Sequence, residues 1–231
     1  MIVFIHGYGM DSKIWDSVKP SFHSDSLFLD INPYIEKGLS IRSIATELSI
    51  FLETQGEDII LVGHSMGGYI ASEIVLNNIE LYKGLVLVNS HVFADSHDKK
   101  KERQKQIDFI IKNGSQKYLR SFFPKLFYGR IATDIQPLIK NYIENISEEV
   151  LVKGQEAMIH RRDCVKVLDL IPVLILHGEQ DRLIPIEFLY KMGSHICKGR
   201  LIKDQISGHM TMVENRVLFA ECLQEFKLHS L

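Results

Sequence analysis

Four short runs of almost pure Ile, Val, Leu and Phe constrain the fold of this chain more than any other feature. Helix-like stretches separate the runs, which are Ile2–Ile5, Ile59–Val62, Leu85–Val88 and Val173–Leu176. Runs of this kind are typical of strands that helices cover on both faces, as in a parallel sheet. Two weaker runs, Leu27–Ile31 and Arg200–Ile202, predict strands of the same sheet. The alternation predicts the α/β class, with a doubly wound, mostly parallel sheet of about six strands.

Helical signals fall between these strands. In residues 41–52 the apolar side chains recur at 3.6-residue spacing, which predicts an amphipathic helix. Thr211 is followed three residues later by Glu214, and this spacing predicts a capping box at the start of the last helix.

The alternation breaks once, between the strand that ends at Asn89 and the strand that begins near Pro172. Residues 91–168 show helical periodicity, many aromatic side chains and 15 Lys and Arg against 10 Asp and Glu, a net charge of +5. A structureless loop of this length is rare in a compact domain. The sequence therefore predicts a helical cap over residues 91–168, inserted into a core of residues 1–90 and 169–231.

Composition excludes several classes of protein. The 231 residues are 45% hydrophobic and 24% charged, with a net charge of −2, which argues against a disordered chain or a nucleic-acid binder. No run approaches about 18 apolar residues, and no basic leader precedes the first strand, so neither a membrane span nor a signal peptide is expected. The three cysteines form no CxxC pair, which argues against a disulfide framework or a zinc site. We expect a cytoplasmic monomer or homodimer without membrane or nucleic-acid partners.

The segment GHSMGG at residues 63–68 lies directly between a predicted strand and a predicted helix. A G-x-S-x-G in this context indicates a nucleophile elbow, in which the serine occupies a strained backbone conformation at a very tight turn. Gly63 and Gly67 avoid the collisions that side chains would cause there. Ser65 is therefore the predicted nucleophile, placed at the carboxyl edge of the sheet. The alternative is a glycine-rich turn that contains an incidental serine.

A serine nucleophile needs a base that a third group orients, and in this fold the chain order is Ser, then Asp or Glu, then His. Asp181 follows the fourth aliphatic run, and His209 follows the last predicted strand. Both should therefore emerge at the same sheet edge as Ser65. Glu179 is an alternative acid, and Asp204 is a weaker one because it falls at the end of a strand. The predicted triad is Ser65, Asp181 and His209.

Acyl transfer also needs donors for the oxygen that becomes negative. The backbone N–H of Met66, directly after the nucleophile, is one expected donor. The N–H of Tyr8, in the HGYG loop after the first strand, is the other; the alternative for this loop is a simple turn. Tyr8, Met66 and His91 are expected to contact the substrate. No HExxH, P-loop or GxGxxG motif occurs, so we expect no metal or other cofactor.

The chain resembles the lid-bearing α/β-hydrolase superfamily, which includes carboxylesterases, enol-lactonases and pimeloyl-ester carboxylesterases. The stretches that carry the resemblance occur in family order and are FIHGYGMDSKIW, LVGHSMGGYIASEI, LVLVNS, MIHRRD, VLILHGEQDRLIP and SGHMTMVEN. The resemblance implies that Ser65, Asp181 and His209 form the triad and that Tyr8 and Met66 supply the oxyanion hole. Two features depart from the family pattern. The sheet is expected to lack the usual N-terminal strand pair, and residues 30–38 lack the D-x-x-G-x-G-x-S sequence.

These features predict a serine hydrolase that cleaves a small-molecule carboxylic ester or thioester through an acyl-enzyme. One alternative is a lyase on the same scaffold, and a more remote one is a ligand receptor without catalytic activity. The basic run at residues 99–105 predicts the solvent-exposed face of a cap helix; alternatively, it attracts anionic substrates. The HRRD sequence at residues 160–163 predicts structural ion pairs.

Overall fold

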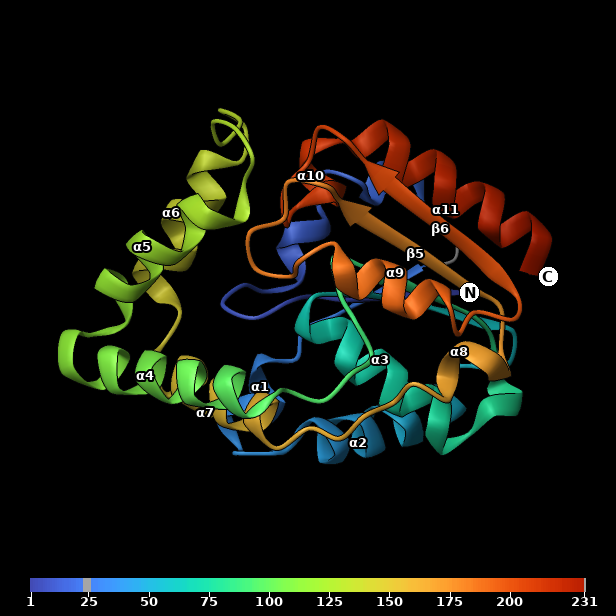
Figure 1. Ribbon diagram of the computed structural model, residues 1–231, viewed down its shortest axis with the longest axis horizontal. Helices are drawn as coiled ribbons and strands as arrows, with labels where there is room; N and C mark the ends of the chain where they lie inside the picture. The colour runs from blue at the N-terminus through green and yellow to red at the C-terminus, as the bar shows by residue number, and fades with distance from the viewer. Residues whose placement is uncertain (23–25, 231) are drawn as a thin grey trace.

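The computed structural model, which describes residues 1–22 and 26–230, contains a six-stranded sheet in which all neighbouring strands are parallel (Figure 1). The order of strands across the sheet is β2-β1-β3-β4-β5-β6. Their bounds are β1 Ile2–Ile5, β2 Ser26–Leu29, β3 Ile59–His64, β4 Tyr82–Val88, β5 Val173–Gly178 and β6 Gly199–Asp204. The predicted fold class and strand number are confirmed, and the sheet is entirely parallel.

Burial explains the composition of the strands. Every residue of β1, β3 and β5 is buried, because these strands have a strand on each side and helices above and below. The edge strands β2 and β6 are partly exposed, which accounts for their weaker apolar patterns. Between the strands, parallel connections bring the carboxyl ends of all six strands to one edge.

Helices cover both faces of the sheet (Figure 1). On one face α2 packs against α3, which contacts β1, β3 and β4. On the other face α11 contacts β4, where the Phe226 ring lies against Gly84. The helical elements outside residues 91–168 are η1 Ser12–Trp15, η2 Lys19–Ser21, α1 Asn32–Glu36, α2 Ile41–Glu53, α3 Met66–Asn77, η3 Ile79–Leu81, α9 Glu187–Gly193, α10 Thr211–Glu214 and α11 Arg216–Ser230, with α8 Val167–Leu170 across the boundary. None of the helices in the described part of the chain is both long and apolar enough to span a membrane.

Of the five helices between β4 and β5 in the chain, the four that precede α8 stand to one side of the sheet (Figure 1). They are α4 His97–Asn113, α5 Ser115–Leu126, α6 Gln136–Asn145 and α7 Glu148–Ile159. The side chains of Ser96 and Ser147 accept hydrogen bonds from the first turns of α4 and α7, which explains where these helices begin. These helices occupy the stretch predicted to be a cap, and the division into core and cap remains a prediction.

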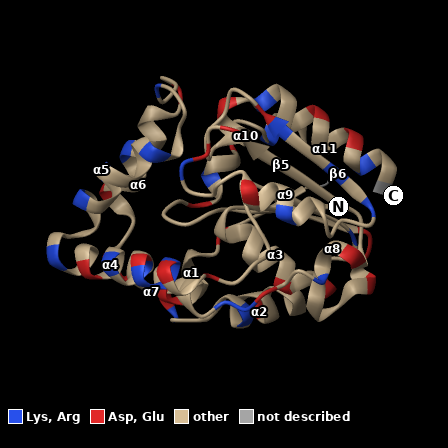
Figure 2. Cartoon of the chain, viewed as in Figure 1, with Lys and Arg blue, Asp and Glu red and all other residues tan. Residues whose placement is uncertain are grey.

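The basic run at residues 99–105 lies on α4, where Figure 2 marks the positions of Lys and Arg in blue and of Asp and Glu in red along the ribbon. Lys101 and Lys105 are exposed, as expected of a solvent-facing surface. Arg103 is the exception, because its side chain is buried and only 9% exposed. One member of the run therefore has a role inside the molecule.

The predicted capping box at Thr211 and Glu214 is wrong. Thr211 begins the short helix α10, which has Met210 as its N-cap and no side-chain capping bond, and the last helix starts at Arg216. The Glu214 carboxylate instead accepts hydrogen bonds from the backbone N–H groups of Gly208, at 2.8 Å, and Tyr128, at 2.7 Å. The local pattern predicted that the Glu214 carboxylate caps a helix, but it binds backbone N–H groups of other segments instead.

Candidate active site

The segment between β3 and α3 has the backbone geometry of a nucleophile elbow. Ser65, the N-cap of α3, has φ +51° and ψ −117°, a conformation that L residues rarely adopt. A Cβ at Gly63 would lie 2.5 Å from the carbonyl oxygen of Gly67, and a Cβ at Gly67 would overlap the carbonyl oxygen of Ile5. Glycine is therefore required on both sides of the serine, as the sequence pattern predicted.

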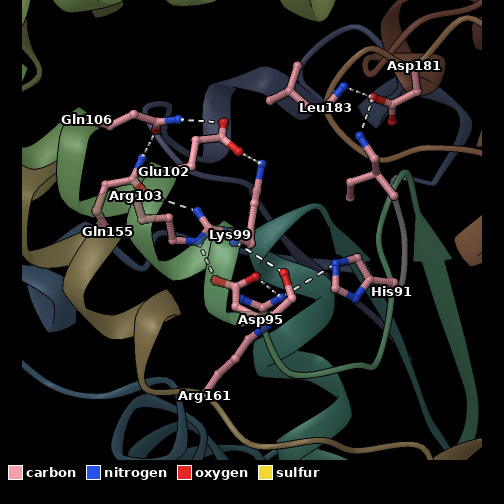
Figure 3. Close-up of polar contacts among 12 residues, drawn as sticks. His91, Asp95, Lys99, Glu102, Arg103, Gln106, Gln155, Arg161, Asp181 and Leu183 are labelled. Atoms are coloured by element: carbon pink, nitrogen blue, oxygen red, sulfur yellow. Dashed lines mark hydrogen bonds and ion pairs between the residues drawn. The ribbon is translucent and has the colours of Figure 1, made fainter.

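Asp181 and His209 form a buried pair at the carboxyl edge of the sheet. The His209 Nδ1 lies 2.7 Å from the Asp181 Oδ2, and the two side chains are 3% and 0% exposed. The other carboxylate oxygen, Oδ1, accepts from the backbone N–H groups of Leu183 and Ile184 (Figure 3). Burial raises the pKa of Asp181, but the charge and hydrogen bond of His209 and the Ile184 N–H outweigh it and lower the pKa to about 2. The carboxylate is therefore ionised at neutral pH.

The neighbours of His209 fix the direction of its ring. Because Nδ1 donates to Asp181, the neutral imidazole has Nε2 as its free acceptor. The backbone N–H of His209 donates to the carbonyl of Leu126 at 2.7 Å, and its carbonyl lies 2.9 Å from the His64 Nε2. His64 directly precedes Ser65, so the loop that carries the imidazole is attached to the elbow. Within the described residues, no hydrogen bond joins the Ser65 hydroxyl to His209.

Two backbone N–H groups, one in the loop after β1 and one directly after Ser65, have no acceptor among the described residues. In the part of the chain that the structure describes, the N–H groups of Tyr8 and Met66 donate no hydrogen bond, although both residues are buried. A Cβ built on Gly7 would lie 3.2 Å from the Ser65 Cβ, so the loop after β1 touches the elbow. The Tyr8 hydroxyl donates to the carbonyl of Leu151 in α7 at 2.9 Å. The Tyr8 side chain thus packs against α5 and α7.

The His91 ring packs among aromatic side chains. Its ring stacks on Phe188 at 4.4 Å, and its Nδ1 accepts from the Phe93 N–H at 3.2 Å. With Tyr69 and Arg161 it lines a cavity of about 10 Å³, room for about one water molecule. Burial, together with the charge of Arg161, lowers the pKa of His91 to about 3, so the ring is neutral. A substrate contact by His91 remains a prediction.

A buried ionic network, here named the cap–core cluster, joins the ends of the helical segment α4–α7 (Figure 3). Its members are Asp95, Arg103, Gln155 and Arg161. The Asp95 carboxylate lies 2.5 Å from the Arg103 Nε and 2.8 Å from an Arg161 terminal nitrogen. Outside the cluster, Arg162 binds the buried Glu73 at 2.6 Å. The predicted structural ion pairs of the HRRD sequence are confirmed for both arginines.

Sequence reasoning missed Asn89, which the structure places beside the Asp181 carboxylate. The Asn89 Nδ2 lies 3.1 Å from the Asp181 Oδ2 and 2.9 Å from the carbonyl of Gly208. We name Asn89, Asp181, Gly208 and His209 the sheet-edge cluster. The available signal was an asparagine at the carboxyl end of a central strand, the same edge at which Asp181 and His209 were expected.

Within residues 1–22 and 26–230, no group of three or more His, Cys, Asp or Glu is arranged to hold a metal ion.

A serine held at a strand-to-helix turn, on an open parallel sheet with an Asp–His pair at the same edge, defines an α/β-hydrolase. Residues 43–214 match the family described as serine aminopeptidase, S33, and the chain belongs to this family. The matched region contains Ser65, Asp181 and His209.

Individual relatives agree with this assignment. The chain is 27% identical over 242 residues to the pimeloyl-[acyl-carrier protein] methyl ester esterase of Wigglesworthia glossinidia brevipalpis, covering 97% of this chain and 92% of that protein. A thermophilic esterase from Thermogutta terrifontis superposes with a TM-score of 0.82 at 20% identity, over 99% of this chain and 89% of the other. MenH from S. aureus gives a TM-score of 0.83 at 19% identity, over 99% and 93%. The expectation of an α/β-hydrolase is confirmed.

Proposed function

We propose that the protein is a serine hydrolase that cleaves a small-molecule carboxylic ester or thioester through an acyl-enzyme on Ser65. The observation that carries the proposal is the 2.7 Å Asp181–His209 pair, attached through His64 to a serine with φ +51°. The similarity to a methyl ester esterase along nearly the whole chain supports an ester as the substrate class.

In the first half of the proposed reaction, the His209 Nε2 takes the Ser65 hydroxyl proton as the serine oxygen attacks the substrate carbonyl carbon. The ionised Asp181 holds Nδ1 and stabilises the imidazolium that results. The unpaired N–H groups of Tyr8 and Met66 donate to the carbonyl oxygen as it becomes negative. The hydrogen bond from Ser65 to His209 is expected to form in the substrate complex, where catalytic hydrogen bonds often tighten.

In the second half, the tetrahedral intermediate expels an alcohol or thiol, which takes its proton from His209 and leaves the acyl group on Ser65. A water molecule then attacks the acyl carbon while His209 accepts a proton from it. Breakdown of the second intermediate returns that proton to the Ser65 oxygen and releases the carboxylic acid. Each step uses the same base and the same two N–H donors.

Ser65→Ala tests the nucleophile. We expect kcat for a short-chain p-nitrophenyl ester to fall about a millionfold, because loss of the serine removes the acyl-enzyme route. A fluorophosphonate probe should label the unmodified protein at Ser65 and should fail to label the variant.

Ser194→Ala is the matched control, since Ser194 is an exposed serine at the end of α9. It should keep both its turnover and its labelling. Retained turnover in the Ser65→Ala variant would refute the proposed mechanism. Turnover of a substrate without any covalent species on Ser65 would favour the lyase alternative.

A further inference from the structure

Asn89 has an unusual backbone conformation at the end of β4. Its φ is +45°, in the left-handed region that asparagine tolerates better than most residues with a side chain. Its backbone N–H donates to the carbonyl of Leu176 at 2.9 Å, which anchors the residue to β5. Its side chain is fully buried. The turn therefore points one amide group from the sheet toward the Asp181 carboxylate.

The amide of Asn89 makes three hydrogen bonds. Its Nδ2 donates to the Asp181 Oδ2 and to the carbonyl of Gly208, and its Oδ1 lies 3.3 Å from the N–H of Thr211. The opposite orientation of the amide would set its oxygen against two acceptors and its NH₂ group against a donor, so the contacts fix the assignment. The Asp181 Oδ2 is also the atom that holds the His209 Nδ1.

We propose that Asn89 is a positioning residue that holds the acid Asp181 and the loop of the base His209 in register. This inference rests on the proposed function. One amide binds the Asp181 carboxylate and two backbone groups of the loop that carries His209, the Gly208 carbonyl before it and the Thr211 N–H after it. Its hydrogen bond to Asp181 also withdraws charge from the oxygen that faces His209.

Other side chains cannot make this set of contacts. The position needs a donor and an acceptor on one short, planar group. An ionised aspartate would set a negative oxygen against Asp181 and the Gly208 carbonyl, and an aliphatic side chain would leave the Thr211 N–H without an acceptor. The chemistry of the contacts therefore selects asparagine.

Asn89→Gly is the first test, because glycine accepts a φ of +45° without strain and removes only the amide. We expect kcat/KM for the p-nitrophenyl ester to fall about 10–100-fold, the usual cost of losing a partner that orients a catalytic group. Without the amide, Asp181 attracts the His209 imidazolium more strongly. The acid limb of the kcat/KM profile should therefore move to higher pH by roughly half a unit.

A proton NMR measurement on the protein without substrate tests the same inference independently of turnover. The Nδ1 proton of His209 should resonate further downfield in Asn89→Gly, because a more basic carboxylate strengthens its hydrogen bond. Should the Gly variant be unstable at the assay temperature, Asn89→Ala removes the same amide. It should give the same shift of the acid limb to higher pH and the same downfield shift of the Nδ1 proton.

Asn215→Ala is the matched control. Its amide also donates to a carboxylate, that of Asp204 at 3.1 Å, and accepts from a backbone N–H, that of Leu218. It should change stability without moving the acid limb or the NMR signal. A lowered rate in Asn89→Gly with an unmoved limb and signal, or an unchanged rate, would overturn the inference. Failure of the fluorophosphonate to label Ser65 in the unmodified protein would instead refute the proposed function.

Discussion

The molecule contains two buried polar clusters, one at the proposed active site and one at the ends of the helical segment α4–α7, and they use charge differently. The sheet-edge cluster contains one carboxylate, one imidazole and one amide, and it leaves the His209 Nε2 without a partner among the described residues. The cap–core cluster sets two guanidinium groups around the single carboxylate of Asp95 (Figure 3). In the proposed mechanism the first arrangement leaves the His209 Nε2 free to accept a proton, whereas the second uses its carboxylate to connect helices.

The positions of the cap–core residues support this contrast. Asp95 lies just before α4 and Arg161 lies just after α7, so their ion pair joins the two ends of the helical segment. Arg103 on α4 binds Asp95 and also donates to Gln155 on α7 at 2.9 Å. The Arg161 guanidinium lies 4.0 Å above the ring of Tyr69 on α3. The cluster thus connects the two ends of the segment to each other and to α3.

Among substitutions within the two clusters, the largest effect is expected from Asp181→Asn, which changes the sheet-edge cluster. The new amide NH₂ group would face His209, so the ring would turn to the tautomer that carries its proton on Nε2 and could not act as a base. We expect kcat to fall about 10⁴-fold, far more than the loss of stability would explain. Steady-state kinetics and thermal melting on the same preparation measure both quantities. A loss of less than tenfold would contradict the role of Asp181.

Asp95→Asn makes the equivalent change in the cap–core cluster. It keeps the shape of the side chain but leaves two buried guanidinium groups without a counter-ion, which should lower the free energy of unfolding by about 3–5 kcal/mol. The activity of the folded variant should fall far less than in Asp181→Asn. Urea denaturation and kinetics below the melting temperature provide the comparison.

The effect of Asp95→Asn should depend on pH. Burial raises the pKa of Asp95, but the hydrogen bond of Arg161 and the charges of both arginines outweigh it and lower the pKa below its usual value. The stabilisation is therefore fully present above about pH 4 and is lost as pH falls through the lowered pKa. The difference in the free energy of unfolding between the unmodified protein and Asp95→Asn should therefore become smaller below pH 4. Glu144→Ala, in the exposed pair with Lys140, is the control and should change stability by less than about 1 kcal/mol at any pH.

The two clusters also differ in how far the sequence could predict them. The elbow at Ser65 could be predicted from a local pattern, because its glycines avoid collisions at the tight turn around Ser65. Asp181 and His209 could be predicted from the sequence because parallel strands bring their carboxyl ends to one edge. The partners of Asn89 lie 92 and 119 residues away, and no local pattern encodes that contact.

The HRRD sequence predicted an ion pair for Arg161, but the part of Arg103 in the cap–core cluster was beyond prediction for the same physical reason. Arg103 belongs to a run of charged residues that reads as a solvent-exposed face, and only the packing of α7, 52 residues further along, turns it inward. The failed capping box shows the converse. The spacing of Thr211 and Glu214 fits a capping box, but the Glu214 carboxylate accepts hydrogen bonds from the N–H groups of Gly208 and Tyr128 instead.

Glu214→Gln should have the smallest effect, and it tests whether the two regions are separable. Each oxygen of the Glu214 carboxylate accepts one N–H, from Gly208 in the sheet-edge cluster and from Tyr128, just after α5. Glutamine has one acceptor oxygen, so one N–H would face an NH₂ group, at a cost of about 1–3 kcal/mol in the free energy of unfolding. We expect kcat to change little, since Asn89 still holds the Gly208 carbonyl. If kcat instead fell as far as in Asp181→Asn, the helical segment would control the geometry of His209 through Glu214, and the two regions would act as one unit.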